Sequence, residues 1–282
     1  MMKETILSTV VILLGATGLL QAKEGELHGA VDVTYQSKYI WRGFDPYGDK
    51  SAIQASVDVD LFGTGLGINV MGHRANSSGY ENSERWDYTL YYQNRLFGEE
   101  CYATNYRVGW VYYNYPDQPV KGTVMAPNAN LQELQAILSW PKICPAGFVP
   151  TYVLVKMWPS PSNSFSGARS SELPSPPFGG SASGWAHIFM LDYGIPMEGL
   201  LPDAPNQVLK LHSELIYNDG VGPVGNDVDH DWSNVVFGAA MDFDLGYNIT
   251  LTPAVYHQIT MEKTVNDDKD ETWATVGAKY TF

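Results

Sequence analysis

Charged residues, cysteines and long apolar runs are all scarce in this sequence. Only 17% of its 282 residues are charged, against about a quarter in ordinary soluble domains. Its two cysteines are too few for a disulfide-built scaffold, and its net charge of −14 excludes nucleic acid as a partner. No glycine-rich phosphate loop and no metal-ligand spacing of Cys and His occurs, so the sequence predicts no cofactor and no metal.

The one apolar run of note lies at the start of the chain. A basic residue, Lys3, precedes an apolar stretch over 6–20, and the small-residue exit Leu20-Gln21-Ala22 follows. This order is typical of a secretory signal peptide over 1–22, and an uncleaved anchor is the alternative. The apolar stretch is shorter than the roughly 20 residues of a helical span. Residues 23–282 therefore form one domain that either stays soluble outside the cytoplasm or crosses a membrane as strands.

Alternation of apolar and polar residues runs through the mature chain. The stretch 53–61 is apolar at every odd position and polar at every even one, the pattern of a strand with two unlike faces. Turn residues cut the chain into twelve such segments, which predict an antiparallel up-and-down β-barrel of about 12 strands. Their expected spans are 27–40, 51–61, 66–73, 85–95, 103–115, 131–140, 148–158, 185–193, 208–217, 233–244, 247–259 and 272–282.

The connections between these segments alternate in length. Those after odd-numbered strands are long and those after even-numbered strands are short, as in an outer-membrane barrel with both termini in the periplasm. The link 194–207 is too long for this rule, so it is either a structured periplasmic segment or a missed pair of strands. The outer loop 159–184 is rich in Pro, Ser and Gly and could fold into the lumen.

The last strand carries the strongest signal. Over 272–282 every even position except Thr272 is apolar, and the chain stops on the aromatic Phe282. Transmembrane barrels of Gram-negative outer membranes usually close in this way, because one strand face meets lipid and the other meets water. We expect outer-membrane lipid to surround the apolar face and the barrel-assembly machinery to recognise this strand through Phe282.

The stretch 31–44, VDVTYQSKYIWRGF, resembles the opening of the TorF family, whose members are classed as porins. Its Ser-x-Tyr-x-aromatic-Arg-Gly motif after a short strand carries the likeness, and Tyr217-Asn218-Asp219-Gly220 resembles a late strand end of that family. The resemblance implies an outer-membrane barrel and porin, and it implies no catalytic residues. The cysteine pair is not a feature of the family.

Strand parity then selects the side chains that face the lumen. Acidic residues outnumber basic ones there, and rings of carboxylates favour cations in a water-filled pore. The alternative is that these groups pair across strands and fill the barrel, which at twelve strands is of intermediate width. The predicted pore-lining residues are Asp32, Asp58, Asp60, Asp87, Arg107, Glu133, Lys156, Asp192, Lys210, His212, Glu214 and Asp242.

Two outer connections leave alternatives open. Arg42, in the loop after the first strand, could fold over the pore or grip an acidic group, or it could pair with a neighbouring acid in an ordinary turn. The loop 218–231 is rich in oxygen ligands but lacks the EF-hand spacing, so it is a weak calcium candidate or a solvated outer loop.

Cys101 and Cys144 fall in two short periplasmic turns, and the strands that lead to them are expected to be neighbours. In an oxidising periplasm such a pair can form a disulfide. We therefore predict a disulfide, with two free thiols as the alternative.

These observations favour passive diffusion of small cationic or neutral solutes through a narrow acidic lumen. The alternative function is a closed barrel whose outer loops bind a surface partner. An outer-membrane lipid hydrolase is a minor alternative: His187 and Ser213 lie on adjacent expected strands, but no third group and no nucleophile motif accompany them. The sequence predicts no enzyme and does not indicate an oligomeric state.

Overall fold

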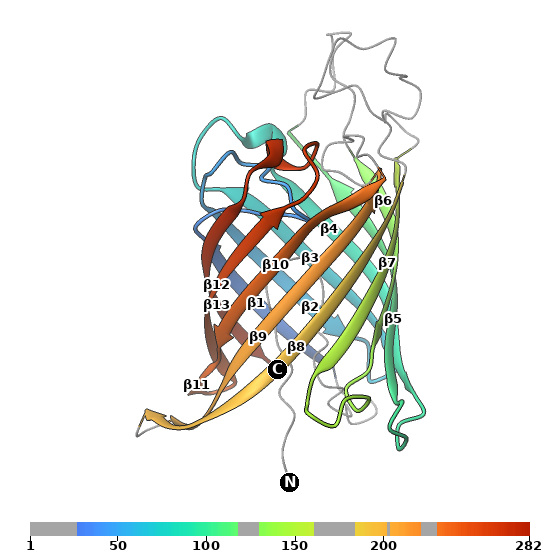
Figure 1. The fold of residues 1–282 in the computed structure, drawn as a ribbon, viewed down its shortest axis with the longest axis vertical. Helices are drawn as coiled ribbons and strands as arrows, with labels where there is room; N and C mark the ends of the chain where they lie inside the picture. The colour runs from blue at the N-terminus through green and yellow to red at the C-terminus, as the bar shows by residue number, and fades with distance from the viewer. Residues whose placement is uncertain (1–26, 118–129, 161–183, 202–203, 221–229) are drawn as a thin grey trace.

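A computed structural model of the chain describes residues 27–117, 130–160, 184–201, 204–220 and 230–282. It is an antiparallel β-barrel (Figure 1) with strands in this order along the chain: β1 (His28–Gln36), β2 (Ala52–Asp60), β3 (Leu66–Ala75), β4 (Arg85–Leu96), β5 (Thr104–Asn114), β6 (Leu131–Ser139), β7 (Val149–Pro159), β8 (Gly184–Leu201), β9 (Ala204–Asp219), β10 (Asp231–Met241), β11 (Phe243–Gly246), β12 (Ile249–Thr260) and β13 (Glu271–Thr281). Two 3-10 turns, η1 (Glu81–Ser83) and η4 (Asn266–Asp268), lie in connections.

The barrel closes between its first and last strands and has twelve staves. Apart from β10 and β11, each strand pairs with its neighbour in sequence, and β1 also pairs with β13. β10 and β11 both pair with β12, so they form one stave that is interrupted at Asp242. The predicted fold class and its twelve strands are therefore confirmed. The expected signal peptide, 1–22, lies outside the described residues.

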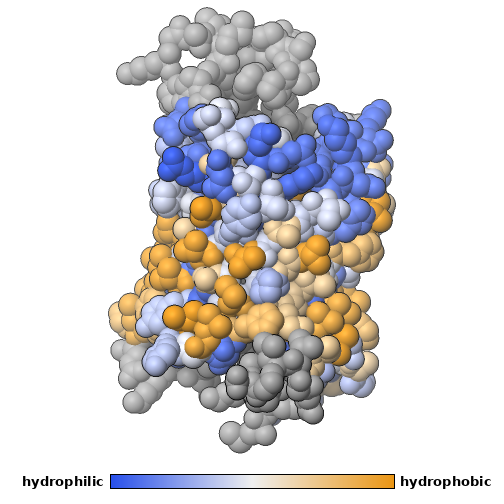
Figure 2. All heavy atoms as spheres, turned by 90° about the vertical axis from the view of Figure 1, so that its left-hand side faces the viewer, coloured by the Kyte–Doolittle hydropathy of each residue, from blue (hydrophilic) through white to orange (hydrophobic). Residues whose placement is uncertain are grey.

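The apolar face of each strand points outward. Val31, Val33, Tyr35 and Leu90 are all exposed, as are Val276 and Tyr280 of the last strand. On the face that Figure 2 shows, hydrophobic residues form a band over the lower half of the wall, and hydrophilic residues gather toward the upper end. This inside-out arrangement places the protein in the outer membrane, because only lipid makes such a surface favourable. In the described part of the chain no helix is long and apolar enough to span a membrane.

The unexplained link 194–207 is a continuation of a hairpin. β8 and β9 pair from Trp185 and Asp219 down to Leu201 and Ala204, well past the ends of their other neighbours. The hairpin therefore projects beyond the wall at the end where β13 stops (Figure 1). Following the predicted orientation, we call this the periplasmic end and the opposite one the outer end.

Candidate functional site

The connection between β1 and β2 does not stay at the outer rim but folds into the lumen. We call residues 38–50 the inserted segment. Its side chains Tyr39, Ile40, Trp41, Arg42, Phe44 and Tyr47 are all buried, although the segment is a connection and not a strand. The aromatic sequence explains this position, because only the barrel interior removes these side chains from water.

A tight turn forms the tip of the inserted segment. Trp41 and Phe44 exchange two backbone hydrogen bonds of 2.7 and 2.9 Å, with Arg42 and Gly43 between them. Both central residues have positive φ, 49° and 93°, as a type I′ turn requires. The carbonyl of Gly43 accepts a 2.8 Å hydrogen bond from Gln258 Nε2 on the wall. The turn thus places the side chain of Arg42 inside the barrel.

Arg42 forms a buried ion pair with Glu133 of β6. Its Nη1 and Nη2 donate to the two carboxylate oxygens of Glu133, each at 2.8 Å, and both side chains are at most 1% exposed. The hydroxyl of Tyr113 on β5 donates to the same carboxylate at 2.9 Å. Burial alone would lower the pKa of Arg42, but the charge of Glu133 outweighs it and the pKa is raised. Arg42 therefore grips an acidic group across the lumen, which was one of the alternatives that the sequence left open.

Two guanidinium groups contact the ring of Trp41. The Cζ atoms of Arg42 and Arg85 are 4.9 and 4.7 Å from its ring centroid. Arg85 Nε donates to Asp87 at 2.8 Å, and its Nη2 donates to the hydroxyl of Tyr39 at 2.9 Å. These contacts tie the inserted segment to β4 by cation–π and charged hydrogen bonds.

The polar contacts continue along the wall. Asp87 also contacts His73 Nε2 at 2.8 Å, and His73 Nδ1 contacts Gln54 Nε2 at 2.6 Å. Gln54 in turn accepts from Gln36 at the end of β1. One network therefore crosses β1, β2, β3 and β4 and meets the inserted segment at Tyr39.

Part of the inner face of β5 to β9 is apolar, which differs from the expected hydrophilic interior. Inward side chains of β5 to β9 pack with the aromatic residues of the inserted segment in one buried cluster. The reason is that the segment supplies an apolar surface for them. The wall members of the cluster are Val111, Tyr113, Leu131, Ile137, Val153, Val155, Met157, Ala186, Ile188, Met190 and Ile216.

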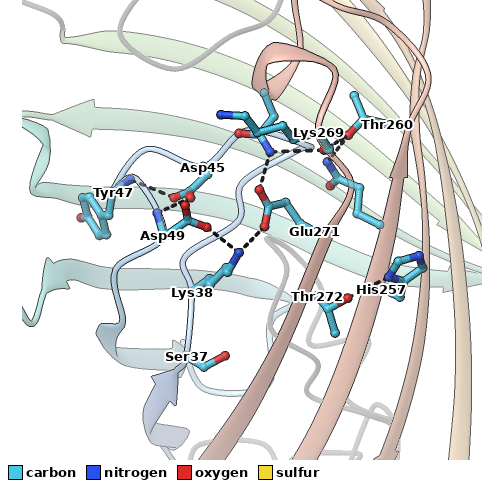
Figure 3. A network of polar contacts seen from close by, with 12 residues as sticks. Ser37, Lys38, Asp45, Tyr47, Asp49, His257, Thr260, Lys269, Glu271 and Thr272 are labelled. Atoms are coloured by element: carbon cyan, nitrogen blue, oxygen red, sulfur yellow. Dashed lines mark hydrogen bonds and ion pairs between the residues drawn. The ribbon is translucent and has the colours of Figure 1, made fainter.

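A cluster of charges at the outer end fastens the inserted segment (Figure 3). Lys38 Nζ contacts Asp49 and Glu271 of β13, each at 2.5 Å. Asp45, Asp49 and Glu271 bring carboxylate oxygens within 4.8 Å of one another, and the ammonium of Lys38, which contacts Asp49 and Glu271, offsets one of their three negative charges. The hydrogen bonds to Asp49 and Glu271 raise the pKa of Lys38, and the same contact lowers the pKa of Asp49.

The periplasmic part of the lumen is charged and only partly buried. Asp58 accepts from Tyr91 at 2.7 Å and lies 3.4 Å from Arg107. His212 Nδ1 lies 2.7 Å from Asp192.

Lys210 pairs with Asp242, which also accepts from Thr252 at 2.8 Å. Asp32 accepts from Thr34 at 2.8 Å. These carboxylates thus have cationic or hydroxyl partners that parity alone could not identify.

Three predicted positions need correction. Lys156 points to the lipid side, where its Nζ lies 5.0 Å from the centroid of the exposed Trp185 ring. β7 is apolar on both faces, so its alternation could not select the inward one. Asp87 and Glu133 face inward but are sealed among the contacts of the inserted segment, so they do not line an accessible pore.

The periplasmic turns and the minor hydrolase alternative also differ from expectation. Cys101 and Cys144 are free cysteines, although their turns do meet: Lys142 Nζ donates to the carbonyl of Gly98 at 2.7 Å. The contact between the turns is thus made by a lysine and not by a disulfide. Ser213 pairs with Leu191, whereas His187 pairs with Tyr217 farther along the hairpin, so the two are not adjacent.

Parts of two outer loops fall outside the described residues. These are 161–183 of the loop 159–184 and 221–229 of the loop 218–231.

Comparisons with known proteins agree with this architecture. A family model described as a bacterial protein of unknown function (Gcw_chp) matches residues 23–148. No curated protein sequence matches significantly. The NanC porin structure is 9% identical, with 90% of this chain and 100% of that chain covered and a TM-score of 0.51.

Two further solved structures resemble the chain. A KdgM porin is 11% identical over 90% of this chain and 99% of its own, with a TM-score of 0.46. The COG4313 outer membrane channel from Pseudomonas putida F1 is 12% identical over 92% and 96%, with a TM-score of 0.45. At such identities the likeness to NanC shows the fold alone, that of an outer-membrane porin. The TorF resemblance is not confirmed by these matches.

Proposed function

We propose that the protein is a narrow outer-membrane channel for small cationic or neutral solutes, with the inserted segment as the barrier at its outer end. The observation that carries the proposal is the charge of the periplasmic part of the lumen. Five inward carboxylates face three inward cations there, which leaves two net negative charges with His212 neutral. The carboxylates are Asp32, Asp58, Asp60, Asp192 and Asp242, and the cations are Arg107, Lys210 and Lys279.

The pairing of these groups limits the selectivity that we expect. Asp58 and Asp242 contact Arg107 and Lys210, so much of the charge of these two carboxylates is neutralised locally. A preference for cations of a few-fold follows, and not an exclusion of anions.

A closed barrel that presents its outer loops to a surface partner is the second candidate. The burial of Trp41 and Arg42 inside the lumen favours it, because a packed interior leaves little room for solutes. The two functions differ in one property, which is whether the folded barrel conducts ions.

Conductance across a planar bilayer tests the proposal. Refolded protein, checked by heat-modifiable migration on gels, should give single-channel steps and a reversal potential that favours cations. Replacing two inward carboxylates together, Asp32→Asn and Asp60→Asn, should lower the cation preference. Asp268→Asn in the exposed η4 turn is the matched control and should leave it unchanged.

Two results would count against the channel. Folded protein without conductance steps, in wild type and in variants that release the inserted segment, would favour the closed barrel. If conductance steps are seen but their reversal potential is unchanged in the double variant, the acidic lumen is contradicted and the channel is not.

A further inference from the structure

We propose that the wall around Glu133 is a binding site for the guanidinium or amidinium group of a passing solute, and that Arg42 occupies this site as an internal stand-in for it. The inference rests on the proposed channel function, and it names the class of solute. The contacts of Arg42 carry it.

The wall offers the geometry that a guanidinium group requires. The two oxygens of Glu133 accept parallel hydrogen bonds of 2.8 Å from the two terminal nitrogens of Arg42. A planar fork of donors matches a carboxylate in this way, whereas a lysine ammonium does not. Tyr113 Oη holds one of those oxygens at 2.9 Å, so the carboxylate is oriented by the wall itself.

The site and its present occupant belong to different parts of the molecule. Glu133 and Tyr113 lie on β6 and β5, whose ladder of paired residues runs from Asn105 and Ser139 to Tyr113 and Leu131. Arg42 lies at the tip of a connection. The acceptor therefore stays in place on the barrel wall if the tip withdraws, and it then lacks a cationic partner.

A second acid lies near Arg42. Glu214 of β9 is 2% exposed and lies within electrostatic range of Arg42. Within the described part of the chain it forms no hydrogen bond and no ion pair. A buried carboxylate without a partner is costly unless a ligand completes it. Arg42 also leaves its own Nε without an acceptor, so it satisfies Glu133 but not the whole site.

The neighbouring cations do not cancel this acidity. Arg85 is held by both oxygens of Asp87, at 2.8 and 3.1 Å. His212, beside Glu214 on β9, contacts Asp192 at 2.7 Å. Glu133 and Glu214 therefore remain as two carboxylates for one guanidinium, which favours a cation in that position.

Chemical rescue tests the site. Arg42→Ala in the full-length refolded barrel removes the stand-in and leaves Glu133, Tyr113 and Glu214. Methylguanidinium in the millimolar range should then bind saturably, raise the thermal unfolding midpoint of the variant and reduce its conductance toward the wild-type level. Tetramethylammonium, a cation without hydrogen-bond donors, should produce none of these three effects. The double variant Arg42→Ala with Glu133→Gln should bind methylguanidinium at least tenfold more weakly.

The outcomes separate the binding site from the channel. Conductance steps with no saturable response to methylguanidinium would overturn the site while sparing the channel. A saturable shift in unfolding midpoint without conductance in any variant would support the site and remove the channel. If Arg42→Ala does not fold, it is refolded with methylguanidinium or with tetramethylammonium: selective recovery supports the site, and equal failure in both overturns it.

Discussion

Lys38 and Glu271 are 233 positions apart in the sequence, yet the Lys38 ammonium lies 2.5 Å from the Glu271 carboxylate (Figure 3). Lys38 begins the inserted segment and Glu271 begins the last strand. The contact therefore fastens the segment at the seam where β1 and β13 close the barrel. Weakening the contact between Lys38 and Glu271 is the most direct way to test whether the inserted segment is the outer barrier of the channel.

Glu271→Gln should loosen the inserted segment. The change removes a charged hydrogen bond from Lys38, which costs about 1 kcal/mol of the free energy that holds the segment in place. We expect a higher fraction of open channels in bilayer recordings. Glu84→Gln is the control, since the ion pair of Glu84 within the described residues is with the exposed Arg74, at 3.4 Å. Equal open fractions in both variants would contradict a fastening role.

Gly43→Ala should destabilise the tip of the segment. A Cβ at Gly43 would lie 2.6 Å from Asn234 Oδ1, at a φ of +93° that disfavours alanine. We expect a loss of about 1–3 kcal/mol in unfolding by urea, together with increased conductance. Gly79→Ala is a matched control, because Gly79 has a φ of +96° but no atom within 4 Å of its Cβ position. A loss as large in the control would show that backbone strain alone explains the effect.

The contacts of Lys38 with Asp49 and Glu271 should be insensitive to pH near neutrality. The pKa of Asp49 is lowered from its ordinary 3.8 by the hydrogen bond from Lys38, so its contribution is present above that value and is lost as the pH falls through the lowered pKa. The pKa of Lys38 is raised from 10.5 by its bonds to Asp49 and Glu271, so its contribution is present below 10.5 and is lost as the pH rises through the raised pKa.

Acrylamide quenching of tryptophan fluorescence follows this dependence through the exposure of Trp41. We expect constant quenching between roughly pH 5 and pH 9 and an increase outside that range. Asp49→Asn should weaken the transition on the acid side. Because the side chain of Asp49 is 65% exposed, the effect of this variant should be small and should fade in high salt. A transition near pH 7 would show that another group controls the segment.

The two cysteines should react as free thiols. Cys101 is exposed and Cys144 is partly buried, and the structure shows no bond between them. Iodoacetamide should add two groups to folded protein without prior reduction, as counted by mass spectrometry. Addition only after reduction would instead establish the disulfide that the positions of the turns suggested.

Strand periodicity made most of the fold predictable. Period-two alternation located all twelve staves, and the outward set of the last strand, Ala274, Val276 and Ala278, was assigned to the correct face. The pattern is local and each outward residue meets the same lipid, so no knowledge of a partner is needed. Where both faces are apolar, as in β7, alternation carries no such information, and Lys156 was placed on the wrong side.

Inward residues have individual partners, and the sequence does not name them. Trp273 illustrates this difference: it is 1% exposed and stacks on Tyr256 inside the barrel. The neighbour that would cover it could not be known before the strands were closed into a ring.

The sequence by itself determined a transmembrane barrel, its strands and its lipid-facing surface, because these follow from composition and from a repeat of two residues. Only the tertiary structure decided that residues 38–50 enter the lumen and that Arg42 meets Glu133, 91 positions away. Such a pairing depends on which walls closure brings face to face, and that is a property of the closed ring and not of any single strand.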